Sequence, residues 1–157
     1  MRRRVAALVW PLLCAASTMA CLVDFGCDDG RFPLEKSFFR EPARRVERFR
    51  RYALPEQYKI FRYGMTREPP DFELTEPIAE HGSVAVPFFL EQLNGTPDDE
   101  TVKDVLLIFE AMARLKTYDV RGDAAVMTTL TSKASTMKDK FWKAEAAKTL
   151  KSIKGLP

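Results

Sequence analysis

The sequence has 157 residues, of which 46% are hydrophobic and 30% are charged, a composition typical of one folded globular domain. Its formal net charge of +3 is supplied entirely by three arginines at positions 2–4. The rest of the chain carries 22 basic and 22 acidic residues, so the general attraction to polyanions that marks nucleic-acid binders is absent. We therefore expect no nucleic-acid partner.

The first twenty residues have the layout of a secretory signal peptide. Three arginines precede an uncharged run at residues 5–16, and small residues follow up to Ala20. We expect residues 1–20 to be removed and the mature chain to be exported to the periplasm or cell envelope. Residues 21–40 mix Asp, Gly and Pro with isolated aromatics, which predicts an extended linker.

Cys21, directly after this segment, resembles the acceptor cysteine of bacterial lipoproteins. The resemblance implies that a lipid on Cys21 anchors the protein to a membrane. Ala20 fits that family, whereas Thr18 stands where the family usually has Leu. Two alternatives stay open: a disulfide between Cys21 and Cys27 in an oxidising compartment, and an uncleaved anchor formed by the 19 uncharged residues 5–23.

Residues 41–157 predict a single all-α domain. Apolar residues recur at helical spacing, prolines stand near helix starts, glycines stand near helix ends, and no alternating strand pattern competes. Ser83, Thr96 and Asp123 are the expected N-caps of three helices. The predicted helices cover residues 42–53, 55–63, 73–81, 83–94, 97–113, 123–133 and 138–153.

The expected core joins the later helices into one apolar interior. Leu90, Phe109, Leu130 and Leu150 are its predicted members from four successive helices. In the last helix we expect one inward stripe, consisting of Phe141, Ala144, Ala147, Leu150 and Ile153.

An internal repeat divides this domain into two similar units, at about residues 82–113 and 122–153. At an offset of 40, the segment 82–86 aligns with 122–126, each being a glycine, a capping residue and an apolar helix start. The pattern resembles the HEAT family of helical repeats, whose units of about 40 to 47 residues contain two helices. The resemblance implies antiparallel helical hairpins stacked as a short α-solenoid. An irregular helical bundle is the alternative.

Signatures of catalysis are missing from the sequence. His81 is the only histidine, no cysteine follows Cys27, and the glycines are scattered singly, so neither a metal-ligand set nor a phosphate-binding loop is visible. We expect a non-enzymatic domain with no cofactor and no metal ion.

Helical repeats present extended surfaces to macromolecules, so the leading hypothesis is a scaffold that binds a protein partner in the envelope. Residues 71–123 carry 12 acidic and 4 basic residues. A basic partner would be steered to the start of the longest helix, where four carboxylates are expected to face solvent: Asp98, Asp99, Glu100 and Asp104.

The alternative function is a peripheral membrane or polyanion binder. Arg44, Arg48 and Arg51 are spaced to share one face of the first predicted helix and could rest on anionic headgroups.

Overall fold

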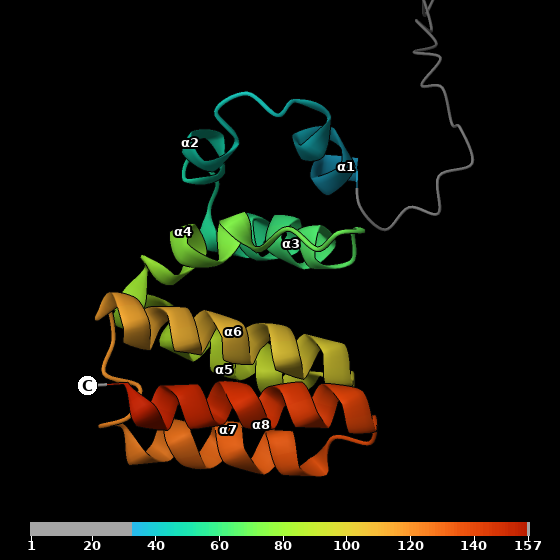
Figure 1. The fold of residues 1–157 in the computed structure, drawn as a ribbon. Coiled ribbons are helices and arrows are strands. Elements are labelled where there is room, and N and C mark those ends of the chain that lie inside the picture. Colours follow the sequence, from blue (N-terminus) through green and yellow to red (C-terminus); the bar gives the residue numbers. More distant parts are fainter. Residues whose placement is uncertain (1–32, 157) are drawn as a thin grey trace, which may run out of the picture.

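The structure is a computed structural model that describes residues 33–156 (Figure 1). The expected all-α class is confirmed, because every regular element of this part of the chain is a helix. Within the same residues, no helix combines the length and apolar character needed to cross a membrane. The expected signal peptide, Cys21 and Cys27 all lie outside the described residues.

In chain order the elements are α1 (Pro33–Arg40), α2 (Arg45–Phe49), α3 (Leu54–Met65), η1 (Phe72–Leu74), α4 (Thr75–Ala79), η2 (Gly82–Ala85), α5 (Val86–Gly95), α6 (Asp99–Leu115), α7 (Ala124–Thr136) and α8 (Lys140–Gly155), where η marks a 3-10 helix. The long helix α6 occupies the middle of the fold, packing against α4 on one side and α8 on the other (Figure 1). Helix α7 packs against α8, and α1 packs against α3.

Helix α1 lies where the sequence predicts an extended linker, so that prediction is wrong for residues 33–40. Aromatic packing explains the helix. The Phe38 ring is buried and meets the rings of Phe49 and Tyr52 edge to face, with centroids 6.1 and 6.0 Å away. Burial of Phe38 fixes α1 onto the domain. The glycines and aspartates earlier in the segment favoured the prediction of a linker over that of a helix.

The first predicted helix, over residues 42–53, is much shorter in the structure. Only Arg45–Phe49 is helical, and Arg44 at its N-cap adopts a left-handed backbone with φ of 50°. Phe49 is fully buried and ties this single turn to the core.

The predicted core is largely confirmed. Phe109 and Leu130 are fully buried and Leu150 is buried, whereas Leu90 is half-buried. The predicted inward stripe of α8 is partly wrong, because Ala144 and Ala147 are exposed. Phe141, from the same stripe, keeps 62% of its surface exposed.

The buried face of α8 is rotated by about one residue from the prediction. Its buried members are Ala146, Thr149, Leu150 and Ile153. Because alanines occupy both faces of this helix, two stripes have nearly the same apolar spacing in the sequence. The larger Trp142 packs on the core instead of Phe141 and decides between them.

Aspartates cap the last three helices. Asp98, Asp123 and Asp139 each accept hydrogen bonds from two backbone N–H groups in the following turn. The expected cap at Asp123 is confirmed. Thr96 and Ser83 are not caps: Asp98 replaces the first, and a 3-10 turn that begins at Gly82 replaces the second.

Gly82 occupies a position that requires glycine. Its φ is +58°, and a Cβ atom built there would lie 2.5 Å from the carbonyl oxygen of Thr117. The turn after α4 is therefore pressed against the loop after α6, where the Thr117 hydroxyl donates to the Ala79 carbonyl at 2.8 Å.

Candidate functional site

The acidic edge predicted at the start of α6 does not exist as a set of free carboxylates. Asp104 is fully buried, and its carboxylate contacts the guanidinium of Arg62 on α3. The Lys103 ammonium lies 2.6 Å from the other carboxylate oxygen and 4.6 Å from the centre of the Trp142 ring on α8. Burial raises the pKa of Asp104, although Lys103 and Arg62 oppose that shift. This cluster is structural: it ties three helices together.

Two more members of the predicted edge serve helix termini. Asp98 caps α6 and lies 3.3 Å from Arg62. Burial by itself would raise the pKa of Asp98, but hydrogen bonds from Thr101 and the charge of Arg62 lower it below its ordinary value. Asp99 accepts hydrogen bonds from two backbone N–H groups in the turn before α8, those of Lys138 and Asp139, at 2.6 and 2.7 Å. Glu100 is half-buried.

The three arginines of the alternative prediction do not form one free face. Arg48 contacts the Glu41 carboxylate and donates to the Phe38 carbonyl at 2.8 Å. Arg44 and Arg51 both pair with Glu47, at 4.0 and 3.0 Å. Acidic neighbours therefore partly neutralise the positive surface that a membrane would meet here.

A groove with carboxylates on its rim opens between η1, α4 and α6. It has a volume of about 510 Å³ and is lined by Phe72, Glu73, Thr75, Glu76, Leu107, Glu110, Ala111 and Arg114. Phe72 keeps 57% of its surface exposed, which is unusual for a large aromatic side chain. Apolar side chains thus line an open groove beside three carboxylates and one guanidinium.

Local sequence explains one wall of this groove. Asp71 accepts a hydrogen bond from the Glu73 backbone N–H at 3.2 Å and so starts the short helix η1. The guanidinium of Arg45 lies 3.0 Å from Asp71 and also contacts Glu73. Leu74 is fully buried, and its burial turns Phe72, two residues earlier, away from the core.

The opposite wall belongs to α6. Leu107, Glu110, Ala111 and Arg114 follow one another at helical spacing and present a second face of a helix whose other residues are mostly core. Arg114 reaches across the groove to Glu76 at 2.7 Å. No ion pair involves Glu110 among the described residues, so its charge is available to a partner. This groove is not among the sites predicted from the sequence, although the helical spacing of its α6 residues is evident there.

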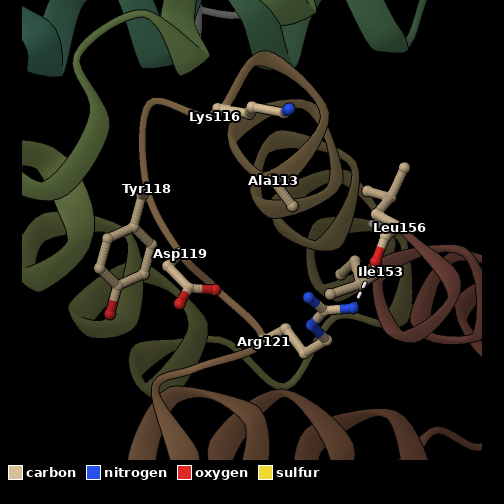
Figure 2. A pocket seen from close by; sticks show the side chains of 7 residues that line it. All are labelled: Ala113, Lys116, Tyr118, Asp119, Arg121, Ile153 and Leu156. Atoms are coloured by element: carbon tan, nitrogen blue, oxygen red, sulfur yellow. Dashed lines mark hydrogen bonds between the residues drawn. The ribbon is translucent and has the colours of Figure 1, made fainter.

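A smaller hollow of about 230 Å³ lies between the loop after α6 and the end of α8 (Figure 2). Figure 2 shows Arg121 turned toward Leu156, whose carbonyl accepts its hydrogen bond, while Tyr118 points the other way. Burial and a 2.5 Å hydrogen bond to Asp123 raise the pKa of Tyr118 to about 12. Arg121 and Tyr118 therefore already have hydrogen-bond partners within the chain and offer little to a ligand.

His81 makes a structural contact with Gln57. Its Nε2 atom lies 2.9 Å from the side-chain oxygen of Gln57, which is buried, whereas His81 is half-buried. Within residues 33–156, no three His, Cys, Asp or Glu side chains lie close enough together to hold a metal ion.

Comparison with known proteins adds no relative from which a function could be inferred. The chain matches no family model, no curated protein and no solved structure. The candidate site consequently rests on the geometry and chemistry of the chain itself.

Proposed function

We propose that this chain is a non-enzymatic, exported domain that holds a protein partner in the groove between η1, α4 and α6. The observation that carries the proposal is the exposed Phe72 beside the carboxylates of Glu73, Glu76 and Glu110. Apolar surface gives binding energy when it is covered, and surrounding charges select and orient the partner. The partner segment that fits is basic, with an apolar side chain that covers Phe72 and Leu107.

The helix arrangement supports a binding role through its shape. Helices α3 and α4, α5 and α6, and α7 and α8 pack as consecutive pairs, and α4, α6 and α8 lie in a row (Figure 1). We interpret these pairs as three stacked hairpins of a short HEAT-like solenoid, in which successive units extend one surface. The groove lies on that row, where α4 meets α6.

The distribution of charged residues along the sequence agrees with a binding site in the groove. Every residue that lines the groove belongs to the segment 71–123, which carries 12 acidic and 4 basic residues. A basic partner would be attracted to this segment from a distance and would then meet the groove. The arginine alternative has weaker support, since Arg44, Arg48 and Arg51 all have acidic partners, whereas Glu110 in the groove has no ion-pair partner among the described residues.

The proposal also includes that the protein is exported and that Cys21 carries a lipid. The support is the sequence pattern of residues 1–21. The intact mass of the protein from envelope fractions separates the lipidated, the cleaved and the uncleaved forms. A lipidated mass that reverts to an unmodified one in Cys21→Ser supports the lipid, whereas a mass lower by two hydrogen atoms than the reduced chain supports the disulfide between Cys21 and Cys27.

Site-specific photocrosslinking in cells tests the groove. A crosslinker at Phe72 should capture one dominant protein, because this side chain stands at the proposed contact. The control position is Val84, which is 85% exposed but lies outside the groove. Charge reversal by Glu110→Lys should abolish the crosslink from position 72. Equal capture from positions 72 and 84, or capture that survives Glu110→Lys, would contradict the proposal.

A further inference from the structure

Helix α8 turns a row of lysines to solvent. The opposite face carries its buried residues and packs against α6. Lys143 is exposed but donates to the Ser135 carbonyl at 2.6 Å. The other exposed lysines are Lys140, Lys148, Lys151 and Lys154. Their separations of eight, three and three residues keep them on one side of a helix with 3.6 residues per turn.

Almost no negative charge accompanies these lysines. Residues 124–157 contain only two acidic residues, Asp139 and Glu145. Asp139 caps α8, accepting from the backbone N–H groups of Phe141 and Trp142. Glu145 pairs with Lys148 at 2.5 Å. Surfaces of small domains usually intersperse both signs of charge, so this stretch with one sign is unusual.

Three of the four lysines have no ion-pair partner among the described residues: Lys140, Lys151 and Lys154. The neighbouring helix α7 contains no acidic residue, and its exposed positions are mainly alanines, serines and threonines. Helices α7 and α8 therefore present a positive face on which three lysines lack a carboxylate partner, bordered by the hydroxyl groups of α7.

Apolar side chains lie on the same face. Phe141, at the start of α8, is 62% exposed, and Ala144 and Ala147 are exposed between the lysines. Helices that lie in a membrane interface carry lysines together with an aromatic or apolar strip, because the lysine stems extend to the headgroups while apolar atoms enter the acyl boundary.

We propose that this face of α8, the lysine face, binds a membrane surface of anionic phospholipids. The headgroup phosphates meet Lys140, Lys151 and Lys154, and the Phe141 ring enters the interface. A lipid surface explains both the lysines and the exposed aromatic ring, whereas a polyanion in solution would leave the ring without a partner.

Vesicle co-sedimentation of the full chain tests this inference. Binding to vesicles of phosphatidylcholine with phosphatidylglycerol and to phosphatidylcholine alone is measured for the original chain and for each variant, all of which carry the same N-terminal segment. The triple variant Lys140→Gln, Lys151→Gln and Lys154→Gln should partition to anionic vesicles roughly 100-fold more weakly, given the usual contribution of a lysine near such a surface. Phe141→Ser should weaken partitioning with all lysines present.

The matched control removes three positive charges elsewhere, by Arg40→Gln, Lys59→Gln and Lys116→Gln. All three residues are exposed, and none has an ion pair among the described residues. This control should bind anionic vesicles like the original chain, and circular dichroism should show both triple variants folded. Equal binding to the two vesicle types, equal losses in the two triple variants, or binding to heparin without binding to vesicles would each overturn the proposal.

Discussion

Replacing Arg62 by Ala should be among the most damaging single changes in the fold. The side chain of Arg62 is 19% exposed and contacts Asp104, whose own side chain is fully buried. Truncation leaves the Asp104 carboxylate inside the domain with Lys103 as its remaining cation. Breaking a buried ion pair from one side costs about 3 to 5 kcal/mol because a charge stays without its partner.

The retained contact with Lys103 places the expected cost at the lower end of that range. Urea unfolding followed by circular dichroism measures it. With a denaturant slope of about 1.5 kcal/mol per molar, a loss of about 3 kcal/mol lowers the urea midpoint by about 2 M. Arg50→Ala is the matched control, since Arg50 pairs with Glu80 through two nitrogens but is 49% exposed. The control should cost less than about 1 kcal/mol.

The pH dependence of the stability lost in Arg62→Ala gives a second test of the Arg62–Asp104 contact. Burial raises the pKa of Asp104, so its contribution to stability falls as the pH rises through that pKa. Removing Arg62 raises this pKa further and makes the ionised carboxylate more costly. The cost of Arg62→Ala should therefore be larger near pH 7 than near pH 4. Equal costs for Arg62→Ala and Arg50→Ala, or a cost of Arg62→Ala that shrinks with rising pH, would refute this reasoning.

Three further changes test other parts of the structure by the same unfolding assay. Ala146→Leu should destabilise by about 1 to 3 kcal/mol through overpacking, whereas Ala147→Leu on the exposed face should change stability little; a larger loss from Ala147→Leu would restore the predicted stripe of α8. Gly82→Ala should cost more than about 1 kcal/mol, because it adds a Cβ atom 2.5 Å from the Thr117 carbonyl oxygen. Asp123→Ala should cost about 1 kcal/mol through loss of the α7 cap, and an unchanged midpoint would contradict that role.

Sequence patterns predicted the elements whose signals are local. The all-α class, the end of α5 at Asn94-Gly95 and the cap at Asp123 follow from apolar spacing and from residues that favour helix termini. The burial of Phe109 and Leu130 follows from the strong periodicity of their helices.

The remaining features depend on contacts between segments far apart in the chain. Asp104 is predicted to face solvent near a helix start, whereas Arg62, 42 positions earlier, approaches it and, together with Lys103, makes its burial tolerable. The helix at 33–40 depends on Phe38 meeting Phe49 and Tyr52. The groove depends on how η1 lies against α6, which no single segment encodes.

The most direct test of the proposed function uses the protein captured from position 72. Its association rate with the purified domain is measured at several salt concentrations, for the original chain and for the double variant Glu76→Gln and Glu110→Gln. The control variant, Glu68→Gln with Glu91→Gln, removes two exposed carboxylates outside the groove. If the groove binds a basic partner, only the Glu76 and Glu110 variant associates more slowly and loses much of its salt dependence. Identical rates and salt dependence for all three proteins would contradict the account.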